Sequence, residues 1–311
     1  MFRRRRLSKS RREYELKRAP EFLVDYEPWC ADRKPGQPEI VGLVAGNQAP
    51  YLLTRLDELR LSQTDVPVLT VTADPANCVA VAGSTRPDWS LRFCAQGEGD
   101  TEIEARERLH ERSMVRAGGT VSLTGPHLLS AAPTRMGRGQ LLVDAPADAA
   151  IVIHASFAAV QIRDLKGPVR VAAAHARTTI LNTTGRVDAI AMVVDFAGSK
   201  GRVTLSAEAE INMRLPTLRF DGTLLAWAQQ SVRTLVPPGS LTPFRAIVRR
   251  RQDFVCRTEF CSRVRQERKG DLYYFTYDGD NSVAPEAVMH LRSEQSTVVI
   301  DTMKEASSGG S

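Results

Sequence analysis

Apolar and polar residues alternate along much of this chain, which is the pattern of β-strands that bury one face. Residues 66–72 alternate in this way, and so do 78–83 and 89–94. From residue 120 to residue 215, strand-like segments follow one another with short breaks. A succession of short strands of this kind predicts an all-β protein.

Three glycines divide the middle of the chain into similar segments. Gly167, Gly185 and Gly201 stand 18 and 16 residues apart. The second and fourth residues after each glycine are apolar, and so is the fifth residue before it. These positions are Val169, Val171, Val187, Ala189, Val203 and Leu205, with Ile162, Ile180 and Phe196 before the glycines. A repeat of this length predicts a β-solenoid, in which each coil buries its apolar face against its neighbours. Glycine at each corner fits a turn that needs a positive φ angle.

One segment, 101–117, has the features of an α-helix. Thr101 and Glu104 have the spacing of a capping box, in which each side chain accepts a hydrogen bond from an exposed backbone N–H group. A glycine pair at 118–119 ends the helix. Its weak apolar face predicts packing against the sheet, with the other side in water. The segment 50–63 fits a helix and a strand equally well, and both interpretations stay open.

Residues 216–302 do not follow the glycine register. They include a predicted hairpin that turns at 269–271 and a final strand at 296–300. An atypical segment is expected at the end of a solenoid, where it covers the open edge against pairing with other strands. We therefore expect a single β-solenoid domain over 38–302, with coils at about 150–214, one packed α-helix and an irregular β C-terminal cap.

The positive charge of the chain is concentrated at its start. The whole sequence has a net charge of +6, and residues 1–18, with nine basic and two acidic residues, carry +7. We expect 1–37 to be a basic disordered arm with a linker, and 303–311 to be a flexible tail. The arm either contacts nucleic acid or an anionic surface through charge, or is a solvated leader. Its candidate contact residues are Arg3, Arg4, Arg5 and Arg6.

No export signal is visible, because no apolar segment follows the basic start. No run of about 18 apolar residues is present either, so no transmembrane segment is expected. The sequence as it stands predicts a cytoplasmic protein, and an export signal upstream of it would place it in the cell envelope.

Two of the five cysteines are close in sequence. Cys256 and Cys261 are separated by four residues, a spacing at which a small disulfide can close in an oxidising compartment. The alternatives are two free thiols or metal ligands. Zinc is disfavoured because the nearest downstream histidine, His290, stands alone.

Standard catalytic and nucleotide-binding motifs are missing from the chain. Asp164 and Asn182 share one position of the repeat, which would begin a polar ladder in a glycan-active β-helix enzyme. Gly198 takes that position in the third coil, so we interpret the pair as turn residues. We expect no enzyme activity and no cofactor, and a glycan-active enzyme is the third-ranked alternative.

Arginines accumulate beside an aromatic strand in the C-terminal segment. The aromatic residues are Tyr273, Phe275 and Tyr277. Basic strands beside an aromatic strand can follow a phosphate backbone and stack on bases. The alternative is that the rings face the core while the arginines are solvated or paired with carboxylates. The candidate contact residues are Arg249, Arg250, Arg251, Arg263 and Arg265.

Four segments precede the glycine-bounded coils: a strand expected in a hairpin at 78–83, and then 101–105, 119–123 and 142–146. Together with the coils they resemble the bacterial adhesin-like β-strand-repeat family of unknown function, of the auto-transporter adhesin head type. The resemblance extends over about 66–300. It implies a β-solenoid without an established catalytic site, and members commonly carry a membrane anchor or signal.

These features predict a non-catalytic structural or interaction scaffold. Long regular faces suit contact with a protein partner or with further copies of the chain. The alternative is nucleic-acid or anionic-surface binding through the basic N-terminal arm and the arginine-rich cap.

Overall fold

The computed structural model describes residues 39–41, 51–73, 77–125, 139–279 and 289–303. Within these ranges the chain forms 21 strands, one α-helix and two short 3-10 helices. The predicted all-β class with one helix is therefore confirmed.

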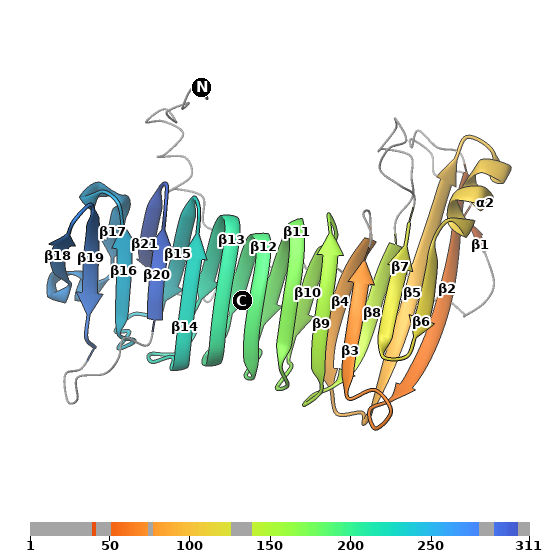
Figure 1. Ribbon diagram of the computed structural model, residues 1–311, viewed down its shortest axis with the longest axis horizontal. Helices are drawn as coiled ribbons and strands as arrows, with labels where there is room; N and C mark the ends of the chain where they lie inside the picture. Colours follow the sequence, from red (N-terminus) through yellow and green to blue (C-terminus); the bar gives the residue numbers. More distant parts are fainter. Residues whose placement is uncertain (1–38, 42–50, 74–76, 126–138, 280–288, 304–311) are drawn as a thin grey trace, which may run out of the picture.

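The strands cross the short dimension of an elongated body (Figure 1). Most pair in parallel with strands of a neighbouring rung, where a rung is two strand segments joined at a bend. β11 (Val169–Leu181), β12 (Arg186–Ala197) and β13 (Lys200–Arg214) each form a rung alone, with a register shift at the bend. The other rungs are β7 (Thr120–Thr124) with β8 (Gly139–Pro146), β3 (Val68–Ala73) with β4 (Asn77–Ser84), β9 (Ala150–Ser156) with β10 (Ala159–Arg163), β14 (Asp221–Ala228) with β15 (Ser231–Val236), β20 (Met289–Ser293) with β21 (Thr297–Thr302), and β16 (Phe244–Val248) with β17 (Phe254–Arg257).

The order of the rungs in space departs from their order in the sequence near both ends of the stack (Figure 1). The rung β3/β4 comes before β7/β8 in the chain, yet it lies between β7/β8 and β9/β10. The rung β20/β21 comes last in the chain, yet it lies between β14/β15 and β16/β17. Each end of the stack therefore contains a rung inserted from elsewhere in the sequence.

Antiparallel strands close the stack at both ends. At one end β5 (Asp88–Gly99) pairs with β8 and with β2 (Tyr51–Ser62), which pairs with β1 (Glu39–Val41). At the other end β19 (Leu272–Tyr277) pairs with β16 and with the outermost strand β18 (Arg265–Lys269). All five residues of β18 are exposed, and four of them are charged. Charged side chains on an edge strand oppose pairing with strands of other molecules.

The helix is shorter than the sequence predicts. It spans Glu102–His110 as α2, with Ala105 and Leu109 buried on the side toward β5 and β2. Thr101 accepts the predicted capping hydrogen bond from the Glu104 N–H group at 3.2 Å, while the Glu104 carboxylate accepts from the Asp100 N–H group instead.

The second half of the predicted helix is a strand. Residues Ser113–Ala117 form β6, which pairs antiparallel with β7 across the glycine pair at 118–119. The pair therefore makes a hairpin turn and does not end a helix, and Gly118 has a φ of 59°. The ambiguous segment 50–63 is strand β2.

A buried arginine connects the end of the helix to the inserted rung β3/β4. The Arg112 guanidinium donates to the side-chain oxygen of Asn77, in β4, at 3.3 Å. The Arg55 side chain, from β2, donates to the Arg112 carbonyl at 2.6 Å. Burial lowers the pKa of Arg112 to about 10, so the group stays charged at neutral pH.

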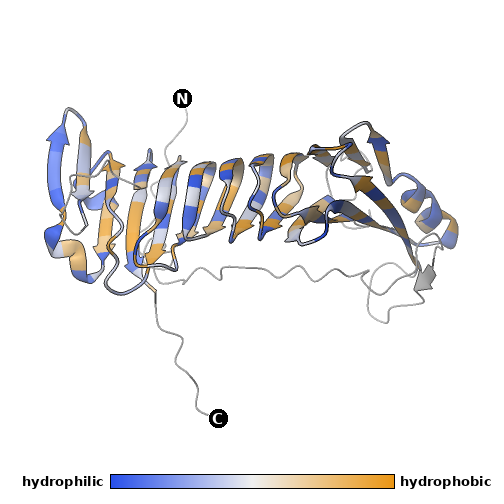
Figure 2. Ribbon diagram, turned by 90° about the horizontal axis from the view of Figure 1, so that it is seen from below, coloured by the Kyte–Doolittle hydropathy of each residue, from blue (hydrophilic) through white to orange (hydrophobic). Residues whose placement is uncertain are grey.

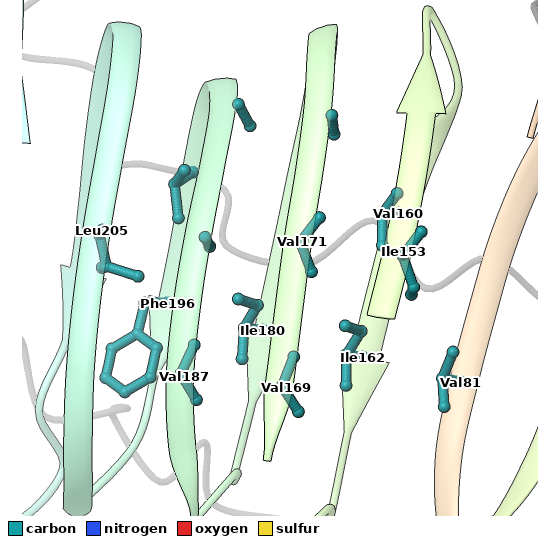
Figure 3. Packing of buried hydrophobic residues seen from close by; sticks show 14 of the residues in the cluster. Val81, Ile153, Val160, Ile162, Val169, Val171, Ile180, Val187, Phe196 and Leu205 are labelled. Carbon is teal, nitrogen blue, oxygen red and sulfur yellow. The ribbon is translucent and has the colours of Figure 1, made fainter. Parts of the chain in front are cut away.

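The core lies between the two sides of the stack and is made of columns of aliphatic residues (Figure 3). Val169, Val187 and Val203 are register partners in three successive rungs, and all three are buried. Ile162, Ile180 and Phe196 form a second buried column. Hydrophobic and hydrophilic positions alternate along the central strands, so each rung points one set of side chains inward and the other outward (Figure 2).

The reason for glycine at two of the three repeat positions differs from the prediction. Gly201 has a positive φ of 127°, but Gly167 and Gly185 are not among the described residues with positive φ. A Cβ atom on Gly167 would lie 2.1 Å from the Ala149 carbonyl oxygen, and one on Gly185 would lie 2.2 Å from the Lys166 carbonyl oxygen. These glycines are therefore required by the close approach of stacked backbones.

The prediction that residues 216–302 leave the register is wrong for four of their strands. Val203 pairs with Leu224 of β14, and Leu224 pairs with Met289 of β20. Gly222 continues the glycine column, because its Cβ atom would lie 2.2 Å from the Gly201 carbonyl oxygen. The regular spacing is lost because a loop at 215–220 precedes β14, and because β20 and β21 return to the stack only after β16–β19.

Candidate anion-binding site

The three consecutive arginines of the C-terminal segment lie at the bend between β16 and β17. A short 3-10 helix, Arg251–Asp253, forms this bend. The Arg250 guanidinium donates two hydrogen bonds to the buried Asp253 carboxylate, at 2.8 and 3.0 Å. This ion pair raises the pKa of Arg250. Arg250 is therefore fixed on the protein, while Arg249 and Arg251 are exposed to solvent.

An open cavity of about 690 Å³ lies against this bend. Its lining residues are Arg249, Arg250, Arg251, Gln252, Arg268, Asp271 and Tyr273. Four arginines against one aspartate give the cavity a positive potential, which attracts anions. Within the described part of the chain, neither Arg249 nor Arg251 forms an ion pair, so their guanidinium groups are open to a ligand.

Two of the three predicted aromatic contacts belong to the protein core. Phe275 is buried and stacks on Phe254 with ring centroids 4.1 Å apart. Tyr277 is buried and stacks on Phe260 at 4.5 Å. These two rings are not available to nucleic-acid bases. Tyr273 borders the cavity, but the Arg268 guanidinium lies 5.5 Å from its ring centroid and covers it.

The remaining candidate arginines are engaged elsewhere. Arg263 donates to the Tyr277 hydroxyl at 2.9 Å and lies over its ring. Arg265 forms an ion pair with Asp278. The structure thus brings Arg249, Arg250 and Arg251 together at the cavity, but not Arg263 and Arg265. The candidate contacts Arg3, Arg4, Arg5 and Arg6 lie outside the described residues, as does the tail after residue 303.

The sequence analysis missed the contributions of Gln252 and Asp271 to this cavity. Their types and spacing give no signal, because they belong to two bends that meet only when β16 and β19 pair antiparallel. The Val248–Tyr273 register of that pairing sets the cavity wall beside the arginine bend.

A disulfide joins Cys256, at the end of β17, to Cys261. It closes the loop that leads into the 3-10 helix Glu259–Arg263. Cys94, in β5 at the opposite end of the stack, is also disulfide-bonded. Disulfide-bonded cysteines thus occur near both ends of the stack.

Replacing Cys256 and Cys261 together by serine is expected to lower the free energy of unfolding by about 2 kcal/mol. The closed loop is short, and the entropy that a crosslink removes from the unfolded chain grows with loop length. Urea unfolding of the oxidised protein and of the double variant measures the difference. An equal loss in the variant and in wild-type protein kept under reducing conditions is expected. A variant as stable as the oxidised protein would contradict the expectation.

Asp164 and Asn182 stand at bends of the stack. Their φ angles are 58° and 51°, in the left-handed region that Asp and Asn tolerate better than most residues. The Asn182 side-chain amide donates to the Asp164 carboxylate at 3.4 Å. This conformation fits the interpretation of the pair as turn residues. Phe157 and His175 have similar φ angles at other bends, and their rings stack at 4.8 Å.

In the described ranges, no group of three or more His, Cys, Asp or Glu side chains is placed to hold a metal ion. The one α-helix of those ranges is neither long nor apolar enough to cross a membrane.

No known family model matches this chain, and no curated protein matches its sequence. Solved structures give remote likenesses. A "putative cell adhesion protein" from Clostridium sporogenes ATCC 15579 is 6% identical with a TM-score of 0.32, over 81% of this chain and 100% of that one. "Putative adhesins" from Bacteroides fragilis NCTC 9343 and Parabacteroides merdae ATCC 43184 are 11% and 7% identical, with TM-scores of 0.27 and 0.30. Each covers 80% of this chain, and 97% and 96% of the respective neighbour is covered. Values this low carry no conclusion about this chain.

Proposed function

We propose that this chain is a non-catalytic structural or interaction scaffold of adhesin-like type, built as a β-solenoid. The observation that carries the proposal is the parallel pairing that runs without a break from rung β7/β8 to rung β16/β17. A stack of this kind aligns outward side chains in straight rows across many strands. Such extended surfaces are what stacked-repeat proteins use for contact with partners.

The proposed contact surface is the outer face of β9, β11, β12, β13 and β14. One row across it consists of His154, Ala172, Ile190, Ser206 and Trp227, which are successive register partners. Ile190 is 62% exposed and Trp227 is 37% exposed, and Met192 and Leu225 are exposed beside them. Exposed apolar side chains gathered on a regular face favour contact with a protein partner or with a second copy of the chain.

The proposed compartment is the cell envelope. Disulfides persist in oxidising compartments and are rare in the cytoplasm. Cys94, Cys256 and Cys261 are all disulfide-bonded. They favour the exported alternative over the cytoplasmic one that the sequence alone suggested.

The scaffold proposal predicts that Ile190→Lys with Trp227→Lys weakens self-association at least tenfold. Two buried charges at a contact cost more than the 1.4 kcal/mol that a factor of ten requires. Sedimentation equilibrium over a range of concentrations measures the dissociation constant. The matched control is Ile103→Lys with Leu218→Lys, since these residues are 71% and 53% exposed but lie off the proposed surface. Equal effects of the two pairs, or a wild-type protein that is monomeric throughout, would contradict self-association through this face.

A second candidate function is binding of nucleic acid or an anionic surface through the basic arm and the arginines of the C-terminal end. The arginine-lined cavity at the β16–β17 bend favours it. The buried positions of Phe275 and Tyr277 count against base stacking and leave charge as the main source of affinity.

A further inference from the structure

We propose that the cavity at the β16–β17 bend binds a segment of acidic polysaccharide, with the ligand's carboxylates on the arginines and its hydroxyl groups on Asp271 and Gln252. The inference rests on the second candidate function and adds the class of ligand. It is carried by four features of the cavity: its open cations, its polar neutral and acidic lining, its lack of an open aromatic face and its size.

The first feature is the arrangement of the cations. Arg250 is held in place by its two hydrogen bonds to Asp253, which makes the bend a fixed platform. Arg249 and Arg251 flank it in the sequence, are exposed, and have no ion pair within the described part of the chain. Arg268 reaches the same cavity from strand β18. A planar guanidinium can donate two parallel hydrogen bonds to one carboxylate, so several carboxylates spaced along a chain suit this set.

The second feature is the mixture of groups that line the same cavity. The Asp271 carboxylate can only accept hydrogen bonds, and the Gln252 amide can both donate and accept. A carboxylate in the lining repels a ligand whose surface is phosphate throughout, and it accepts hydrogen bonds from hydroxyl groups. A uronic-acid unit offers one carboxylate and several hydroxyl groups on each ring, which matches both parts of the lining.

The third feature separates a polysaccharide from single-stranded nucleic acid. Proteins that bind single strands without sequence preference gain about 1–3 kcal/mol per base from stacking on aromatic side chains. Here the one aromatic residue of the cavity, Tyr273, has Arg268 over its ring. Phe275 and Tyr277, on the same face of β19, are buried. The site therefore has charge and hydrogen-bonding groups but no stacking platform for bases.

The fourth feature is the size and position of the cavity. Its volume of about 690 Å³ lies within the range of small-molecule sites, about 300–1,000 Å³, so it holds a short segment of a sugar chain. The cavity is open and lies at the end of the stack that is opposite α2 (Figure 1). A long polymer can therefore pass through the site and continue beyond the protein.

The test uses the full chain and a defined probe, decagalacturonate, with binding measured by isothermal titration calorimetry at low and moderate salt. The site variant is Arg249→Gln with Arg251→Gln and Arg268→Gln. The control variant loses the same charge at exposed arginines far from the cavity: Arg170→Gln with Arg202→Gln and Arg219→Gln. To remove binding by the arm, every protein compared also carries Arg3→Gln, Arg4→Gln, Arg5→Gln and Arg6→Gln.

We expect the dissociation constant for decagalacturonate to rise at least tenfold in the site variant and less than twofold in the control. We also expect neutral dextran not to bind. Thermal unfolding at the wild-type temperature shows that the site variant is folded. A site variant that binds as well as the control would overturn the inference.

Single-stranded (dT)10, a nucleic acid of similar length and charge, separates the two levels of the claim. We expect it to bind at least tenfold more weakly than decagalacturonate. Equal or tighter binding of (dT)10 that depends on the same three arginines overturns the polysaccharide inference and leaves the anion-binding function standing. Failure of both probes to bind overturns the inference and the anion-binding role of the cavity together.

Discussion

A chain that ends at residue 288 is expected to lose the folded structure of its C-terminal end. Such a chain lacks β20 and β21, the rung that lies between β14/β15 and β16/β17. Without it, β17 has no strand partner among the described residues, and β16 keeps only its antiparallel pairing with β19. The loss therefore reaches beyond the deleted residues to everything from β16 to β19.

The size of this effect follows from what the inserted rung buries. Met289, Leu291, Val298 and Ile300 are all buried between the neighbouring rungs. Burial of each such side chain contributes about 1.5–3 kcal/mol. The sum is comparable with the whole stability of an ordinary domain, about 5–15 kcal/mol. Neighbouring residues such as Leu224 and Val232 also lose the partners that cover them.

Hydrogen exchange and limited proteolysis measure the outcome directly. In the shortened chain we expect the amides of 244–277 to exchange at rates close to those of an unfolded chain, and trypsin to cut at 249–251. β11 and β12, which pair only with other rungs of the middle, are expected to keep more protection. The control is a chain that ends after Met303, which keeps the whole inserted rung. Equal protection of 244–277 in both chains would show that the inserted rung does not hold the end of the stack.

The inserted rungs mark the limit of what the sequence can predict about this fold. The columns of Val169, Val187 and Val203 were predictable, because residues at a fixed spacing become neighbours when consecutive rungs stack. The place of β20 was not, because its partner Leu224 is 65 residues away in the sequence and β16–β19 intervene. Periodicity detects neighbours along the chain, and at both ends of this stack the neighbours are distant in the chain.

The candidate site shows the same limit on a smaller scale. The run Arg249–Arg250–Arg251 was visible as a concentration of charge. Which of the surrounding groups share a cavity with it depends on the antiparallel register of β16 and β19, which places Tyr273 opposite Val248. The alternation of Tyr273, Phe275 and Tyr277 did indicate that the three share one face of a strand. That this face is turned toward the core is settled by Phe254 and Phe260, which stack on it from other segments.

The insertion of rungs also bears on folding. Neither β3/β4 nor β20/β21 can complete its pairing until segments on both sides of it are present, so both depend on contacts between residues far apart in sequence. Folds dominated by such contacts fold slowly. We infer that the middle rungs, which stack in sequence order, form before the two ends are completed.

Gly185→Ala is the second substitution from which we expect a large effect, a loss of about 3 kcal/mol or more of unfolding free energy. The added Cβ atom would lie 2.2 Å from the Lys166 carbonyl oxygen and 2.5 Å from that of Gly167. Both atoms belong to the backbone of the preceding rung, so no side chain can turn aside to make room. The clash is relieved only if rungs β11 and β12 separate, which weakens the hydrogen bonds and the buried column on both sides of it.

Gly270→Ala is the matched control, because it introduces the same methyl group where no neighbour is present. Gly270 turns the β18–β19 hairpin with a φ of 60°, and a Cβ atom there would meet nothing within 4 Å. Its cost is limited to the strain of a left-handed conformation, about 1–2 kcal/mol. Urea unfolding of both variants at 25 °C separates the two causes. If Gly185→Ala costs no more than Gly270→Ala, the middle of the stack can widen easily, and close backbone approach is not the reason for the glycine column.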